Sequence, residues 1–155
     1  MQEPQQKRKQ QASSEVRCFA FRLVPGEDLV QGVRSFVAAH HLRAVAVVTC
    51  VGSLTRVTLR FANAEKWVEK RGPFEILSLA GTVDEHGEHL HIGLADSRGR
   101  CIGGHFGTGS NVYTTVEIVL AELTALEFRR MPCSLSGYDE LKVTSRKQAP
   151  GGKRR

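Results

Sequence analysis

The sequence predicts an α+β fold with a largely antiparallel sheet, and three observations support this. Segments with the two-residue alternation of a β-strand follow one another along most of the chain. Short turn motifs, rather than long crossovers, join most of these segments, which is the connection that antiparallel neighbours need. Only one segment, near the N-terminus, repeats its apolar residues at a helical period.

The first elements are a strand and this helix. Residues 17–24 alternate in the way of a half-buried strand, and Pro25-Gly26 ends it. Glu27 and Asp28 then place negative charge where a helix would begin, which suits the helix dipole. The following apolar positions recur at helical spacing: Leu29, Val33, Phe36, Val37 and His40.

The next region predicts two strands and a polar connection. Residues 44–51 form a continuous apolar run, typical of a strand buried on both faces. We expect a turn at Gly52-Ser53 and a second, alternating strand over 56–61. The polar stretch 63–72 follows, with a short helical turn expected around Trp67.

The C-terminal half predicts a series of strands joined by tight turns. Residues 84–87 and 96–100 have the composition of such turns. Residues 112–123 fit a strand or a helix, and their β-branched residues favour a strand. Residues 137–141 are expected to close the core. The strands expected here are 74–83, 88–95, 101–106, 112–123 and 125–130.

The chain divides into a folded domain, 16–144, and two polar tails, 1–15 and 145–155, which we expect to be disordered. The net charge of +6 belongs to the C-terminal end, because residues 142–155 hold six basic side chains and no acidic one. A near-neutral domain gives no electrostatic footprint for phosphate, so any DNA contact is expected through the basic tails. A solubilising role for these tails is the alternative.

Sequence features also restrict the compartment and the class of protein. No apolar run reaches the length of a membrane span, and the N-terminus has no secretory pattern, so we expect a cytoplasmic or nuclear protein without membrane contact. The four cysteines form no CxxC pair, which argues against a zinc finger or a thioredoxin-like site. We expect reduced and mostly buried thiols.

Three histidines form the candidate site. His89 and His91 are two residues apart on one expected strand, so both side chains project from the same face. His105 lies on the next expected strand and can approach them if the two strands pair. Three imidazoles on one face suit Zn²⁺ with a fourth position left open. The competing interpretation is three ordinary surface histidines.

The neighbours of these histidines leave the chemistry open. Asp96, Ser110 or Glu117 could orient the rings, and Glu117 is the internal candidate for a general base. Gly103-Gly104-His105 is glycine-rich but lacks the lysine of a phosphate-binding loop. A catalytic residue is therefore not assigned, and we expect a binding protein rather than an enzyme.

Several motifs in order resemble the PPC (plants and prokaryotes conserved) domain family over about residues 17–144. They are Gly72-Pro73-Phe74-Glu75-Ile76-Leu77-Ser78-Leu79-Ala80-Gly81-Thr82, His89-Leu90-His91, Gly103-Gly104-His105, Val112-Tyr113-Thr114-Thr115-Val116-Glu117 and Gly137-Tyr138-Asp139-Glu140-Leu141. The resemblance implies a mainly antiparallel central sheet of about seven strands, flanked by a few helices and assembled as a homotrimer.

The resemblance also implies a function. Plant relatives join the domain to an AT-hook and act as nuclear DNA-binding regulators, and some prokaryotic relatives resemble zinc binders through histidines matching His89, His91 and His105. This chain has no Arg-Gly-Arg-Pro hook, and Pro73 stands where the plant motif has arginine, which weakens the transfer of sequence-specific DNA binding.

Two further hypotheses belong to other classes. The first is a small metal-dependent hydrolase or lyase that uses an open three-histidine zinc site. The second is an electrostatic nucleic-acid binder that acts through its tails. The leading hypothesis remains a homotrimeric, metal-holding binding module with a DNA-associated or regulatory role.

Overall fold

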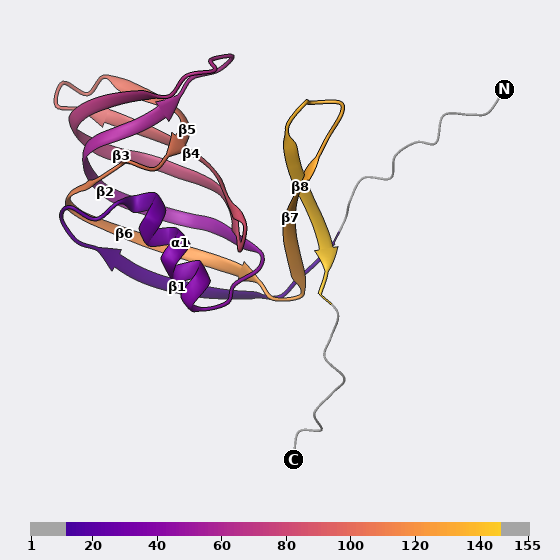
Figure 1. Ribbon diagram of the computed structural model, residues 1–155. Coiled ribbons are helices and arrows are strands. Elements are labelled where there is room, and N and C mark those ends of the chain that lie inside the picture. Colours follow the sequence, from indigo (N-terminus) through magenta and orange to yellow (C-terminus); the bar gives the residue numbers. More distant parts are fainter. Residues whose placement is uncertain (1–11, 147–155) are drawn as a thin grey trace.

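The computed structural model describes residues 12–146, and it arranges them as eight strands and one helix (Figure 1). Most of both predicted tails, 1–11 and 147–155, lies outside the described residues. The elements are β1 (Val16–Leu23), α1 (Leu29–Ala39), β2 (Val45–Arg60), β3 (Val68–Asp84), β4 (Gly87–Asp96), β5 (Cys101–Gly107), β6 (Val112–Leu123), β7 (Leu126–Pro132) and β8 (Asp139–Ser145).

Six of the strands form one antiparallel sheet in the order β1-β6-β2-β3-β4-β5. The end of β2 also pairs with β5, so strands β2 to β5 close on themselves. β7 and β8 form a separate two-stranded sheet. The mostly antiparallel architecture is confirmed, but residues 12–146 hold one helix where a few were expected, and eight strands instead of about seven.

The helix begins where the sequence predicts. Asp28 is the N-cap, and its carboxylate accepts the backbone N–H of Gln31 at 2.9 Å. The buried side chains of α1 enter the main core, and Phe36 stacks on Phe21 of β1 with ring centroids 4.2 Å apart. Within residues 12–146, no helix has the length and apolar character that a membrane span requires.

The expected turn at Gly52-Ser53 is wrong, because β2 continues through both residues. Gly52 has a φ of +139°, and a Cβ there would lie 2.0 Å from the carbonyl oxygen of Thr115. The glycine therefore permits a close approach of β6, with register shifts on either side, rather than a reversal. The helical turn expected at Trp67 is also absent, because that residue lies in the connection before β3.

The strand expected to be buried on both faces is buried on only one. Val45 and Cys50 are in the core, whereas Val48 and Val51 are 57% and 53% exposed. The continuous apolar run therefore leaves β-branched side chains on the outer surface of the central strand.

The segment 137–141 does not close the main core, contrary to expectation. It opens β8, and Tyr138 is 66% exposed. The β7–β8 hairpin packs its own small cluster, in which Leu126 and Phe128 are buried against Ala44. The sequence pattern could not show this, because Ala44 is far from Leu126 and Phe128 along the chain.

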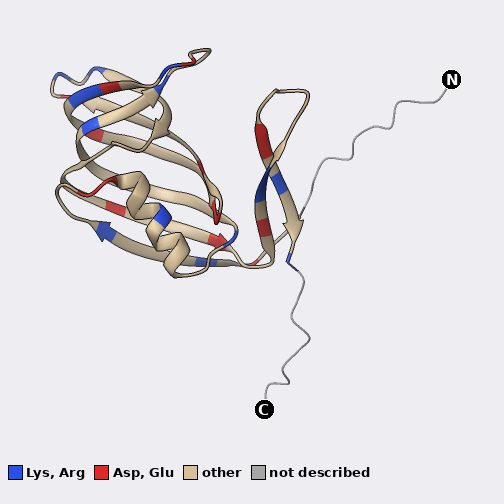
Figure 2. Cartoon of the chain, in the orientation of Figure 1, with Lys and Arg blue, Asp and Glu red and all other residues tan. Residues whose placement is uncertain are grey.

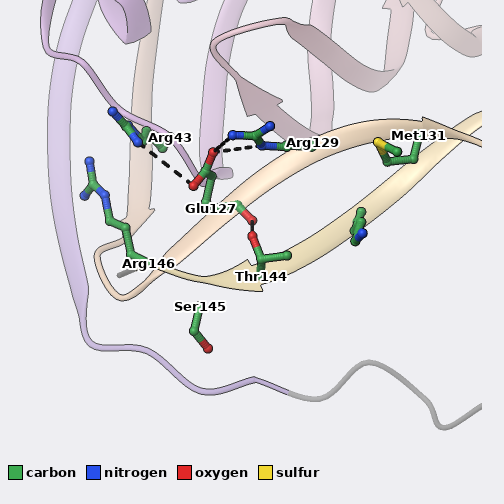
Figure 3. Close-up of a pocket in the computed structure, with 8 residues that line it drawn as sticks. Arg43, Glu127, Arg129, Met131, Thr144, Ser145 and Arg146 are labelled. Atoms are coloured by element: carbon green, nitrogen blue, oxygen red, sulfur yellow. Dashed lines mark hydrogen bonds and ion pairs between the residues drawn. The ribbon is translucent and has the colours of Figure 1, made fainter. Parts of the chain in front are cut away.

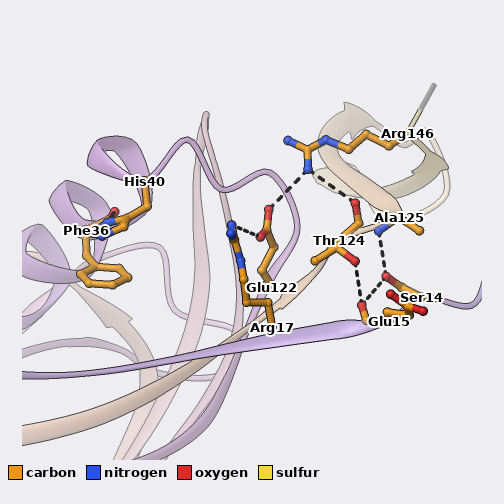
Figure 4. Close-up of polar contacts among 9 residues, drawn as sticks. All are labelled: Ser14, Glu15, Arg17, Phe36, His40, Glu122, Thr124, Ala125 and Arg146. Carbon is orange, nitrogen blue, oxygen red and sulfur yellow. Dashed lines mark hydrogen bonds and ion pairs between the residues drawn. The ribbon is translucent and has the colours of Figure 1, made fainter. Parts of the chain in front are cut away.

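Ion pairs attach the hairpin to the sheet. Glu122 of β6, 2% exposed, accepts a hydrogen bond from Arg17 at 2.8 Å and one from Arg146 at 3.5 Å (Figure 4). The backbone N–H of Arg146 donates to Ala125 at 2.7 Å. Ser145 is the last residue of β8, and Arg146 follows it directly.

The thiols are less buried than expected. Cys50 is buried, and this burial raises the pKa of its thiol to about 12. Cys18 and Cys101 are exposed, and Cys133 is half-buried. All four are free, as the absence of a paired motif predicts.

Candidate metal centre

Two paired strands bring the three histidines together. His89 and His91 project from alternate positions of β4, and His91 lies directly opposite His105 of β5. The turn between the strands is fixed by Asp96, whose carboxylate accepts the backbone N–H groups of Arg98 and Arg100. The register set by this turn confirms the expectation that the three rings share one face.

The ring nitrogens are close enough to share an ion. One ligand nitrogen from each of His89, His91 and His105 lies within 4.8 Å of the others, and the Nε2 atoms of His89 and His91 are 3.3 Å apart. Tetrahedral zinc with bonds of roughly 2.0–2.1 Å places its ligand atoms about 3.3 Å from one another. The His89–His91 separation therefore already matches an edge of such a site.

The rings border a pocket of about 440 Å³, lined also by residues 60–63 and by Gly103 and Gly104. A Cβ on Gly103 would lie 2.5 Å from the carbonyl oxygen of Ile92, and one on Gly104 would lie 2.9 Å from that of Arg60. These glycines thus allow β5 to lie close to both neighbouring strands, which places His105 beside the other two rings.

Burial and nearby positive charge keep two of the rings neutral. Burial lowers the pKa of His105 to about 4, with further lowering by the charges of His89, Arg60 and His91. Burial also lowers the pKa of His89, and His91 and Arg130 add to the effect. Neutral imidazoles at pH 7 have the free lone pair that a metal ligand needs.

The three proposed ring-orienting residues lie elsewhere, so these expectations are wrong. Asp96 is held in its turn by Arg100, and Ser110 bonds the backbone of Gly107 and Thr58. Glu117 lies on β6 between β1 and β2, exposed to solvent. None of the three lines the pocket.

Two neighbours of the site could not be foreseen from the sequence. Arg60 lies opposite His105 because the end of β2 pairs with β5. The ring of Trp67, the single tryptophan, lies 5.4 Å from that of His105 between centroids. Both contacts depend on the pairing of β2 with β5, and a local sequence pattern does not predict that pairing.

Two further histidines, His40 and His86, lie apart from the site. His40 stacks on Phe36 at 4.1 Å between ring centroids, and its Nδ1 is 2.9 Å from the Phe36 carbonyl oxygen. His86 lies in the β3–β4 turn beside Glu85. Neither side chain lines the pocket beside the three histidines.

The family model of the Plants and Prokaryotes Conserved (PCC) domain, the PPC domain named above, matches residues 10–124. The chain belongs to this family. The match ends after β6, so the β7–β8 hairpin lies beyond the matched range.

Solved PPC-like structures share the fold. A hypothetical protein from Salmonella cholerae-suis is 45% identical, with a TM-score of 0.86, and the alignment covers 88% of this chain and 99% of that one. A metal-containing protein from Archaeoglobus fulgidus is 25% identical, with a TM-score of 0.74, covering 85% of this chain and 98% of the other.

A curated relative places a PPC-like sequence inside a longer protein. The bifunctional protein GlmU of Synechococcus sp. (strain JA-3-3Ab) is 41% identical over 128 residues, or 83% of this chain. These residues are 21% of that protein, so the chain spans about a fifth of the length of the curated relative that it matches.

Proposed function

We propose that this PPC protein is a homotrimeric binding module that holds a zinc ion through His89, His91 and His105, with a DNA-associated or regulatory role. The observation that carries the proposal is the convergence of three ring nitrogens from two paired strands at the wall of one pocket. The depressed pKa values of His89 and His105 support it, because neutral rings bind metal without first losing a proton. The metal-containing relative from Archaeoglobus fulgidus agrees with it.

Elemental analysis tests the metal directly. Protein purified in the presence of zinc and then desalted is expected to retain about one zinc per chain, as a three-nitrogen site with one open position would hold it. Removal of zinc by a chelator should change the fluorescence of Trp67, whose ring lies beside His105. Wild-type protein that retains no stoichiometric metal would show that the metal part of the proposal is wrong.

The homotrimer is supported by an exposed apolar surface on the sheet. We call Val48, Val51, Leu77 and Tyr113 the sheet patch, and each is at least half exposed. These residues lie on β2, β3 and β6, which are neighbours in the sheet order. Exposed apolar residues on central strands indicate a surface that another chain covers. Since the patch is on every chain, a cyclic assembly can cover it in each copy.

Charge inserted into the sheet patch is expected to dissociate the trimer. Leu77→Arg, at a position 58% exposed in the single chain, should give monomers, since a buried unpaired charge at the interface costs several kcal/mol. Size-exclusion chromatography with light scattering measures the result, with wild type expected at three chain masses. Leu135→Arg, at an 81% exposed position outside the patch, is the matched control and should stay trimeric. Monomeric wild type, or a trimeric Leu77→Arg variant, would contradict this assembly.

A metal-dependent hydrolase or lyase is the second candidate, favoured by the open pocket beside the histidines. Bound zinc would supply Lewis acidity and an activated water. The lining of the pocket in residues 12–146 contains no carboxylate to act as a general base, since Glu117 lies on β6 away from it. The binding module is therefore the better supported of the two.

A further inference from the structure

The base of the β7–β8 hairpin carries a second, larger pocket that the histidine site does not use. Its volume is about 730 Å³, against about 440 Å³ beside the histidines. We call it the basic cleft (Figure 3). Its lining residues are Arg43, Glu127, Arg129, Met131, Lys142, Thr144, Ser145 and Arg146.

Positive charge dominates the basic cleft, with four basic side chains against one carboxylate. That carboxylate, Glu127, accepts two hydrogen bonds from Arg129, at 2.9 and 2.7 Å, which lower its pKa. The Nη1 atom of Arg43 lies 3.9 Å from Oε2 of Glu127, the carboxylate oxygen that Arg129 does not contact. One carboxylate does not neutralise four cations, so the cleft keeps an excess of positive charge toward solvent.

Two of these cations oppose each other across the hairpin. Arg129 of β7 and Lys142 of β8 are direct partners in the ladder, and both strands of this hairpin carry basic positions (Figure 2). Like charges at such positions destabilise a pair of strands, and a two-stranded sheet has little stability of its own. An anion bound in the cleft would relieve this repulsion. The pairing of two cations is therefore what an anion-binding site would be expected to contain.

Hydrogen bonds and an ion pair fix the positions of the residues that line the cleft. Arg146 contacts the buried Glu122 and the carbonyl oxygen of Thr124, both at 3.5 Å (Figure 4). The backbone N–H of Phe128 donates to the carbonyl oxygen of Arg43 at 3.0 Å, so β7 lies alongside the segment before β2. The cations are therefore held by three separate parts of the chain, and an anion would find them already assembled.

We propose that the basic cleft binds phosphate groups of a nucleic-acid backbone. This deepens the DNA-associated role proposed above and rests on it. Guanidinium groups and lysine are the usual partners of phosphate oxygens. The cleft opens at the surface, and the chain continues from Arg146 into a segment with four more basic residues, Lys147, Lys153, Arg154 and Arg155.

The proposal changes which residues are expected to bind DNA. The sequence alone assigns the charge of 142–155 to a tail, but Lys142 belongs to β8 and Arg146 is held by Glu122. Arg43 and Arg129, which both precede residues 142–155, line the same pocket. Binding should therefore depend on folded residues as well as on the C-terminal segment.

Fluorescence anisotropy with a short labelled DNA duplex tests the cleft in the full-length chain. The double variant Arg43→Gln/Lys142→Gln removes two cleft charges and spares the Arg129–Glu127 and Arg146–Glu122 pairs. The matched control Lys66→Gln/Lys70→Gln removes two exposed charges at and before the start of β3. The cleft variant should bind about tenfold more weakly, and its salt dependence should fall by about two counterions. The control should stay near wild type.

Each other outcome overturns the proposal in a distinguishable way. Equal losses in both variants would mean that only net charge matters. Unchanged binding in both would place the contact elsewhere while leaving the DNA association intact. No binding by wild type would overturn the DNA-associated role itself. A second arm measures thermal stabilisation by inorganic phosphate at constant ionic strength. Phosphate stabilisation lost in the cleft variant, with DNA affinity unchanged, would assign the cleft to free phosphate instead.

Discussion

Replacement of His91 by alanine is expected to reduce zinc affinity more than 100-fold, while the fold stays intact. His91 lies opposite His105 in the ladder, and its Nε2 is 3.3 Å from that of His89. His91 is therefore next to both of the other two proposed ligands. Removal of an outer partner of a metal ligand typically costs about 10–100-fold in affinity, and removal of a ligand should cost more. Since its side chain is exposed, the variant should fold normally.

Competition with a chromogenic zinc chelator measures this change, and circular dichroism checks the fold. His86→Ala is the matched control, because His86 lies in the turn before β4 and faces Glu85 rather than the site. It should bind zinc as wild type does. A His91→Ala protein with unchanged affinity, or an equal loss in both variants, would remove the three-histidine site.

Alanine in place of Gly81 is expected to destabilise the protein by about 3 kcal/mol or more and to weaken zinc binding as well. Gly81 has a φ of +141°, and a Cβ there would lie 1.9 Å from the carbonyl oxygen of His89. The backbone of β3 or β4 must move to remove this overlap. Because His89 carries one of the three rings, its displacement should separate it from His91 and His105.

Urea unfolding followed by circular dichroism measures the loss of stability. Gly87→Ala is the control in the same hairpin, since its Cβ would have no atom within 4 Å. Its cost should be about 1 kcal/mol, from backbone conformation alone. If the two variants lose the same stability, close packing at Gly81 does not support the site.

The parts of the site that depend on local geometry could be predicted from sequence. Strand alternation places His89 and His91 on one face, and the short turn at 96–100 returns the chain so that His105 faces them. The start of the helix follows in the same way, because Glu27 and Asp28 precede an apolar helical pattern, and Asp28 is the N-cap in the structure. In each case the deciding residues are close together along the chain.

The parts that depend on long-range packing could not be predicted. Arg60 reaches the site because β2 closes onto β5, and Gly52 continues a strand because β6 lies against it. A glycine that permits close approach looks the same in a sequence as one that permits a turn. The exposure of Val48 and Val51 could not be predicted either, because a continuous apolar run does not show which of its side chains face solvent.

X-ray absorption spectroscopy of the zinc-loaded protein tests the central claim most directly. The account predicts three imidazole nitrogens at roughly 2.0–2.1 Å from zinc and one exchangeable oxygen ligand from water. Sulfur at about 2.3 Å would point to the cysteines instead, and a shell without imidazole scattering would show that the histidines do not hold the ion.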